Sequence, residues 1–262
     1  MRFDDAFANS KYLADGKYFP SRWAEKAAAF RESQGDRARL GLRYGTADRE
    51  WFDLYLPGGT PEGLVVFIHG GFWLAFGPRD FSHLAAGAVA RGWACAMPAY
   101  TLAPAARISE MTQQMFAALP VMAAEVAGPI VATGHSAGGQ LSARMASFDG
   151  LTDRGMIGRL ARVVPISPLS DLRPLRETEM QKDLQISDAE AISESPALGP
   201  KRPGVRVHVW VGGAERPRFL DQARRLGNAW SCPVTVDPGL HHFNVIEGLE
   251  TPDSRLMRAL LG

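Results

Sequence analysis

Short apolar runs alternate with longer amphipathic segments along this chain, and the pattern predicts strands that alternate with helices. Residues 64–68, Leu-Val-Val-Phe-Ile, are all apolar, which is typical of a parallel strand buried on both faces. We therefore expect an α/β fold with a mostly parallel central sheet and helices on both faces. Further strands are predicted at 93–97, 129–132, 162–166, 205–211 and 232–236, and helices near 80–91, from 108 onward, at 140–146, 217–230 and 254–261.

The first part of the chain follows a different pattern. Residues 40–44 and 51–56 read as two strands of an antiparallel hairpin at the edge of the sheet. Residues 1–34 form an N-terminal arm whose helix begins near Pro20 and would place Trp23, Ala27 and Phe30 on one face. We expect that face to pack on the main domain, and the arm could also line the entrance of a site.

Two prolines and one long polar segment complicate the prediction. Pro120 should kink or divide the helix that begins near residue 108, and Pro165 is unusual in a central strand. Residues 170–200 are polar and mixed, without a clear strand, and are interpreted as a lid or excursion over the strand ends.

Composition indicates one ordinary globular domain over residues 1–262, with 46% apolar and 22% charged residues and a net charge of +1. No basic stripe is interleaved with aromatics, so we expect no nucleic-acid partner. Cys95 and Cys232 make no disulfide framework. Without a signal-like segment or an apolar run of about 18 residues, we expect a cytoplasmic protein without a membrane span. The oligomeric state stays open, a homodimer included.

Candidate chemistry centres on residues 134–138, Gly-His-Ser-Ala-Gly, which match the G-x-S-x-G pattern. An apolar run precedes the motif and a helical segment follows it, so Ser136 would stand on a sharp turn between a strand and a helix. Gly134 and Gly138 remove side chains that would collide in such a turn. Ser136 would also lie at a helix N-terminus, where free N–H groups suit a transient oxyanion.

A serine nucleophile needs a base, and the favoured base is His242, in a turn beyond Pro238-Gly239 after the last predicted strand. His241 competes with it directly. The other histidines are less suited, because two stand inside predicted elements and one is adjacent to the serine: His208, His83 and His135.

The base needs an orienting carboxylate, and Glu215 follows the carboxyl end of the strand predicted at 205–211. A carboxylate there would point to the same rim as Ser136. Asp171, which follows the preceding strand, is the alternative, and Asp221 and Asp237 are weaker candidates.

Oxyanion donors are predicted directly after the strand at 64–68. Gly70 and Gly71 follow His69 there, and their backbone N–H groups can join that of Ala137. The six histidines show no spacing typical of a zinc site, and no phosphate-binding glycine loop is present, so we expect neither metal nor cofactor.

From about Arg43 onward the chain resembles the α/β-hydrolase family, and within it the hormone-sensitive-lipase-like esterases. A narrower likeness is to the serine-type kynurenine formamidases (arylformamidases), which usually have aspartate where this chain has Glu215. The resemblance implies Ser136 as nucleophile, Glu215 as orienting acid, His242 as base, and Gly70, Gly71 and Ala137 as amide donors. The matching segments are 69–73, 100–104, 134–139 and 242–243 for the wider family, and 69–73, 171–175, 215–219 and 242–247 for the narrower one.

The implied reaction is hydrolysis of a small carboxylic ester or N-formyl aryl amide through an acyl-enzyme. Phe72 and Trp73 would pack against an aromatic leaving group, or else in the core beneath the oxyanion loop. A general short-chain carboxylesterase is the first alternative. A binding protein that keeps the pocket without catalysis is the second, and the presence of serine, acid and histidine candidates disfavours it.

Overall fold

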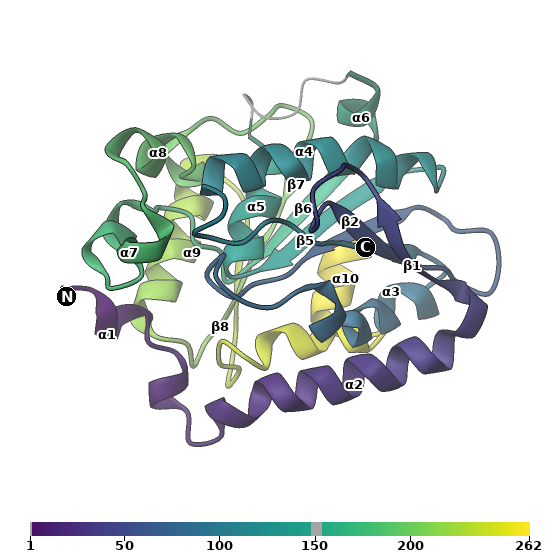
Figure 1. Ribbon diagram of the computed structural model, residues 1–262, viewed down its shortest axis with the longest axis horizontal. Helices are drawn as coiled ribbons and strands as arrows, with labels where there is room; N and C mark the ends of the chain where they lie inside the picture. The colour runs from purple at the N-terminus through teal and green to yellow at the C-terminus, as the bar shows by residue number, and fades with distance from the viewer. Residues whose placement is uncertain (1, 148–153) are drawn as a thin grey trace.

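The computed structural model describes residues 2–147 and 154–262 and shows a central sheet with helices on both faces (Figure 1). The strand order is β1-β2-β4-β3-β5-β6-β8-β9, with β7 beside β6. β2 pairs antiparallel with β1 and β4, and the remaining pairs are parallel. The fold class expected from the sequence is therefore confirmed. The strands are β1 Ala38–Arg43, β2 Trp51–Tyr55, β3 Leu64–Ile68, β4 Ala94–Pro98, β5 Ile130–His135, β6 Leu160–Ile166, β7 Arg206–Val207, β8 Val209–Gly212 and β9 Val234–Asp237.

Two apolar cores lie on the two faces of the sheet. β3 contributes to both, because its alternate side chains point in opposite directions: Leu64, Val66 and Ile68 into one core, Val65 and Phe67 into the other. The first core is covered by α4 (Ile108–Ala124), α5 (Ala137–Met145) and α9 (Pro217–Trp230), and the second by α2 (Phe19–Gln34), α3 (Ala86–Ala90) and α10 (Arg255–Leu261).

The N-terminal arm packs as its pattern predicts. Trp23 and Ala27 of α2 are buried and Phe30 is half-buried, and both aromatic rings pack against the second core. The segment before α2, which includes α1 (Asp4–Phe7), continues past the carboxyl ends of the strands to α9 (Figure 1). The arm therefore follows one face of the molecule, and its first helix, α1, lies beside α9.

At three places the structure is more specific than the local pattern. Within the segment 80–91 only α3 is α-helical, and 3₁₀ turns precede it. We attribute these turns to the hydroxyl of Ser82, which accepts hydrogen bonds from the side chains of Arg31 in α2 and Tyr55 in β2. Pro120 lies inside α4, which continues through it as one helix. The strand expected at 205–211 is split at His208 into β7 and β8, and Pro165, which has no N–H group, falls opposite that interruption.

Residues 170–200 contain short helices and 3₁₀ turns, including α7 (Gln181–Leu184) and α8 (Asp188–Ser193), and no strand. They lie beside the first core, and one of their residues, Met180, reaches the cavity described below. α6 (Arg154–Arg159) precedes β6. Across the described ranges no helix combines the length and apolar character that a membrane crossing requires.

Candidate active site

Ser136 stands where β5 ends and α5 begins, in a left-handed backbone conformation with φ 56° and ψ −114°. The flanking glycines explain how this turn fits. A Cβ at Gly134 would lie 2.2 Å from the carbonyl oxygen of Gly138, and a Cβ at Gly138 would lie 2.0 Å from that of Ile68. Larger residues would have to push the start of α5 away from β3 and β5. The strained conformation keeps the serine at the mouth of the turn, beside the first free N–H groups of α5.

His242 and Glu215 form a buried pair. The Nδ1 atom of His242 donates a hydrogen bond of 2.6 Å to Oε2 of Glu215, whose side chain is fully buried. The other carboxylate oxygen accepts bonds from the Ser167 hydroxyl and from the backbone N–H of Gly212. This arrangement leaves Nε2 of His242 free to act as a base when Nδ1 holds the proton.

The rival acids are engaged elsewhere. Asp171 accepts two hydrogen bonds from the guanidinium of Arg173 and lies 3.6 Å from that of Arg225. The Arg173 bonds hold the pKa of this carboxyl below its usual range although burial acts against them. Asp171 is therefore an ion-pair partner, and Glu215 is the carboxylate that meets a histidine. Asp221 and Asp237 pair with arginines as well: Arg218 and Arg225 for the first, Arg255 for the second.

The rival histidines are bonded elsewhere or held neutral by burial. Nδ1 of His241 accepts the backbone N–H groups of Phe243 and Asn244, and Nε2 of His208 bonds the Thr235 hydroxyl. His83 is buried, and burial lowers its pKa to about 4. His135 lies in the turn itself, with its ring 4.5 Å from that of His242. Burial and the neighbouring His242 hold the pKa of His135 well below its usual range, so it stays neutral.

The predicted oxyanion loop lies against the serine. A Cβ at Gly70 would lie 2.9 Å from the His135 carbonyl oxygen and 3.2 Å from the Ser136 Cβ, so a larger residue would force the serine turn to shift. Gly71 has φ 110°, which also favours glycine. Within the described ranges no acceptor is bonded to the backbone N–H groups of Gly70, Gly71 or Ala137. The three amides are thus available to an oxygen placed beside Ser136.

His69 anchors the start of this loop. Its ring is fully buried and stacks on Tyr100, with centroids 4.4 Å apart, and the Tyr100 hydroxyl donates to the His69 carbonyl. Burial lowers the pKa of His69 to about 3, so the ring is neutral at ordinary pH. The neutral, tightly packed ring of His69 therefore supports the backbone amides that follow it in the loop.

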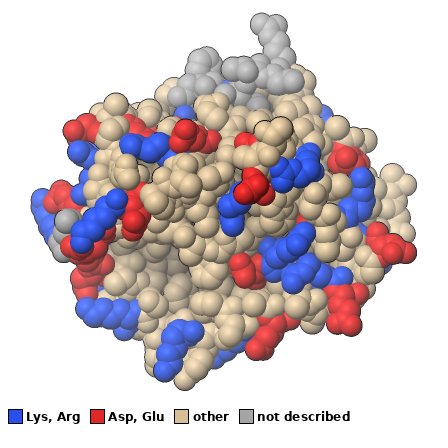
Figure 2. Space-filling view, in the orientation of Figure 1, with Lys and Arg blue, Asp and Glu red and all other residues tan. Residues whose placement is uncertain are grey.

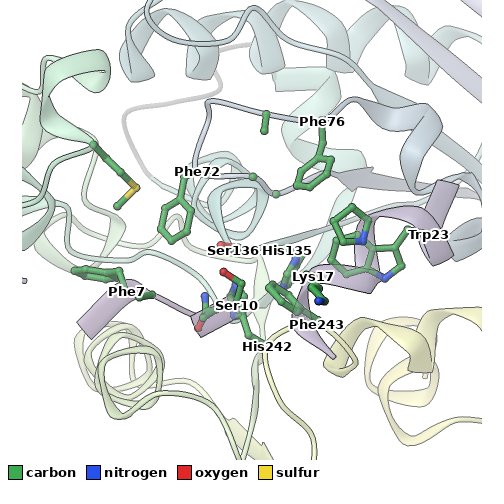
Figure 3. A pocket seen from close by; sticks show the side chains of 18 of the residues that line it. Phe7, Ser10, Lys17, Trp23, Phe72, Phe76, His135, Ser136, His242 and Phe243 are labelled. Carbon is green, nitrogen blue, oxygen red and sulfur yellow. The ribbon is translucent and has the colours of Figure 1, made fainter. Parts of the chain in front are cut away.

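Phe72 and Trp73 have different environments. Both adopt left-handed backbone angles, with φ 52° and 60°, which turn adjacent side chains in different directions. Phe72 points into the cavity (Figure 3), whereas Trp73 is fully buried and donates its indole N–H to Gln140 of α5. The expected substrate contact at Trp73 is therefore corrected: this side chain supports the loop from the core.

Ser136 and His242 share one cavity of about 540 Å³ (Figure 3). In the space-filling view this face of the molecule is hollowed, with mostly uncharged atoms around the hollow (Figure 2). Six aromatic side chains contribute to the wall, which suits an apolar, ring-bearing ligand. The aromatic residues are Phe7, Trp23, Phe72, Phe76, Phe81 and Phe243.

The N-terminal arm forms a wall of the cavity that the sequence left unassigned. Phe7, Ser10 and Lys17 line it together with the serine and histidine (Figure 3). Asn9 belongs to the same wall. The amphipathic pattern identifies the helix from Pro20 onward, but the residues before it have no periodicity that would orient them. In the described parts of the chain, no three metal-ligating side chains gather into a cluster.

A family model of the alpha/beta hydrolase fold matches residues 65–198, which contain the oxyanion loop and the serine turn. The chain belongs to this family. Kynurenine formamidase of Salmo salar is 25% identical to it, over 94% of this chain and 93% of that protein. The Drosophila melanogaster kynurenine formamidase is 23% identical, over 84% of this chain and 79% of its own length.

Solved structures agree with this assignment. A protein of Silicibacter sp. TM1040, provisionally named a thioesterase, is 51% identical, with a TM-score of 0.98 and 100% of both chains covered. The Pyrobaculum calidifontis esterase has a TM-score of 0.69 at 17% identity, with 93% of this chain and 91% of its own covered. The second likeness concerns the fold alone. Family membership and the formamidase relatives support an enzyme of the hydrolase class.

Proposed function

We propose that this protein is a serine hydrolase that cleaves an N-formyl aryl amide or a related small carboxylic ester through an acyl-enzyme. The observation that carries the proposal is the 2.6 Å hydrogen bond between His242 and Glu215 beside the cavity that Ser136 lines. A histidine that is oriented by a buried carboxylate and faces a strained serine is the arrangement that activates a weak hydroxyl nucleophile.

The proposed mechanism uses the same groups in both half-reactions. Nε2 of His242 takes the proton of Ser136 as Oγ attacks the substrate carbonyl carbon. The resulting oxyanion is held by the amides of the oxyanion loop and of Ala137. His242 then gives its proton to the leaving amine or alcohol, and an acyl-enzyme remains. Water, deprotonated by the same histidine, attacks the acyl carbon and releases the acid and Ser136.

In the described structure, Ser136 Oγ has no direct hydrogen bond to His242, although both line the cavity. Such contacts are often long without substrate and tighten when it binds.

The aromatic wall supports an aryl leaving group. Phe72, Phe76 and Phe243 lie around the serine and histidine in Figure 3, and flat aromatic ligands pack well against such rings. The formamidase relatives agree with this preference, since the formyl group is the smallest acyl group and leaves the cavity to the aromatic part.

A second candidate is hydrolysis of a short-chain ester or thioester by the same residues. The observation that favours it is the 51% identity to the Silicibacter protein that is provisionally named a thioesterase. Both reactions pass through the same kind of tetrahedral oxyanion and differ only in the leaving atom. The fit of the leaving group in the cavity should therefore decide which substrate is preferred.

The test compares formate release from N-formylkynurenine with cleavage of p-nitrophenyl acetate and of an acetyl thioester. Ser136→Ala should abolish turnover. Ser142→Ala is the matched control, because Ser142 is also buried in α5 but bonds only the Gly139 carbonyl. Fast formate release supports the formamidase, and turnover of only the other substrates supports the second candidate. If the wild type processes none of them and Ser136 resists a fluorophosphonate label, the serine-hydrolase proposal is wrong.

A further inference from the structure

Two aromatic rings lie closest to the imidazole of His242, and the ring of Phe243 lies farther away, with its centroid at 6.0 Å. The centroid of Phe219 lies 4.2 Å from that of the histidine, with the planes inclined at 43°, and the centroid of His135 lies at 4.5 Å. Phe219 is fully buried, so this contact is a permanent part of the site. The mechanism above assigns no role to either ring.

The start of α9 places the ring and the acid together. Glu215 stands just before the helix and Phe219 lies in its first turn, so one short segment presents both to His242. Behind Phe219 is Phe7 of the N-terminal arm, which meets it edge to face at 5.9 Å and is itself 2% exposed. Arg216, between acid and ring, bonds Asp5 and covers the ring of Tyr12, so the arm is tied down at this point.

The charge on His242 changes during the proposed reaction, because it becomes an imidazolium when it accepts the serine proton. A cation within about 6 Å of an aromatic centroid is attracted by the negative face of the ring, most strongly where water is excluded. The titratable groups around His242 act differently from the Phe219 ring. Glu215 is the counter-charge at Nδ1, His135 is held neutral, and burial lowers the pKa of His241 below its usual range.

We propose that Phe219 is a positioning residue that holds the His242 ring in line with Ser136 and stabilises its imidazolium, and that Phe7 of the N-terminal arm supports it from behind. This inference rests on the proposed function. It makes the arm a contributor to catalysis through packing, although the arm carries none of the reacting groups.

The sharpest test keeps the shape of the ring and changes its charge distribution. Pentafluorophenylalanine at position 219 removes the negative face of the ring while still filling the site. We expect the NMR titration midpoint of the His242 Cε1 proton to move to lower pH by about 0.5 to 1 pH unit. The acid limb of the kcat/KM profile should shift in the same direction. An unchanged midpoint and an unchanged acid limb would overturn the proposal.

A genetic version uses Phe219→Leu, with Phe52→Leu as the matched control, because Phe52 is equally buried in β2 and away from the cavity. Phe219→Leu should lower kcat about tenfold with little effect on KM, and Phe219→Tyr should restore most of the loss. An equal loss in the Phe52→Leu variant would indicate a purely structural role and overturn the proposal.

The His242 titration is read without substrate, so it separates this inference from the proposed function. If the midpoint moves in the pentafluorophenylalanine protein but Ser136→Ala keeps full activity, the serine mechanism is refuted. The role of the Phe219 ring then still stands. A fixed midpoint in an active enzyme that depends on Ser136 would refute only the role of Phe219.

Discussion

The hydroxyl of Ser167 donates a 2.5 Å hydrogen bond to Oε1 of Glu215, the carboxylate whose other oxygen faces His242. Ser167 follows β6 in a left-handed conformation with φ 47°, which turns its side chain toward the acid. The backbone N–H of Gly212 bonds the same oxygen at 2.8 Å. Donors at the ends of two neighbouring strands, β6 and β8, therefore fix the position from which Glu215 bonds His242.

Ser167→Ala should weaken catalysis without abolishing it. The variant removes one of three hydrogen bonds to a buried carboxylate, and bonds to charged groups contribute about 1.5–3 kcal/mol. We expect kcat/KM to fall by about ten- to a hundredfold, measured on the best substrate. Ser170→Ala is a control, because the Ser170 hydroxyl bonds Gln222 and not the acid. A Ser167→Ala enzyme with wild-type kinetics would show that this bond contributes nothing to the orientation of Glu215.

Glu215→Gln should be far more damaging. The amide keeps the size of the side chain but loses the charge that stabilises an imidazolium, so kcat should fall by about 10³- to 10⁴-fold. Asp171→Asn changes the rival acid, which pairs with Arg173, and should leave kcat within a few-fold of wild type. Steady-state kinetics of the two variants decide between the acids. If Asp171→Asn lowered kcat more than Glu215→Gln, Asp171 would be the carboxylate that orients the base.

Gly138→Ala should prevent the turn around Ser136 from forming. The added Cβ would lie 2.0 Å from the Ile68 carbonyl oxygen and 2.5 Å from that of His69, both backbone atoms that cannot swing away. We expect a loss of about 3 kcal/mol or more in the free energy of unfolding. Gly199→Ala is the matched control, since a Cβ there meets nothing within 4 Å. Equal urea midpoints for the two variants would contradict this account of the turn.

Phe72→Ala should affect substrates according to their leaving groups. Its ring lines the cavity, so its loss should lower kcat/KM for an aryl formamide about tenfold and leave ethyl acetate nearly unaffected. Trp73→Phe should instead lower the free energy of unfolding by about 1 kcal/mol, through the lost bond to Gln140. Kinetics on both substrates and urea unfolding test this division. Equal losses on both substrates would argue against a leaving-group contact at Phe72.

Stability should fall as the pH drops below about 6.5. Burial lowers the pKa of His69 to about 3 and that of His83 to about 4, against an ordinary value of 6.5. Between these values the unfolded chain binds protons that the folded protein does not, so acid favours unfolding. Each histidine should cost about 2 kcal/mol between pH 7 and pH 5.

Urea unfolding at the two pH values tests this, and His83→Gln isolates one histidine that lies away from the cavity. The difference between pH 7 and pH 5 should shrink by about 2 kcal/mol in this variant. The same difference in variant and wild type would mean that His83 is protonated in the folded protein.

The serine turn could be predicted from the sequence because its requirements are local. Gly134 and Gly138 are needed by backbone atoms within the turn and the adjacent strand, and their spacing is visible in the sequence. Glu215 and Asp171 could not be separated in this way, because both follow the carboxyl end of a strand. Partners decide between them: Arg173 and Arg225 surround one, and His242 meets the other.

The shape of the cavity depends on contacts between distant segments. Phe72 and Trp73 are neighbours of similar chemistry, and only the left-handed backbone at both positions determines which one faces the cavity. The wall formed by residues 7–17 could not be predicted, because its position is set by packing on α9 and not by its own periodicity. The 3₁₀ turns before α3 are a smaller case, in which bonds to Ser82 outweigh a helical pattern.

The contact of the N-terminal arm with α9 bears on how the protein is made. Phe7 is synthesised more than 200 residues before Phe219 and His242, although the three rings pack in one row. Until α9 is made, Phe7 lacks the ring on which it packs, whereas α2 of the same arm can already dock on residues 78–85. Enzyme activity would therefore appear late and abruptly in a synthesis reaction, as a signal that the arm and the last helices have met.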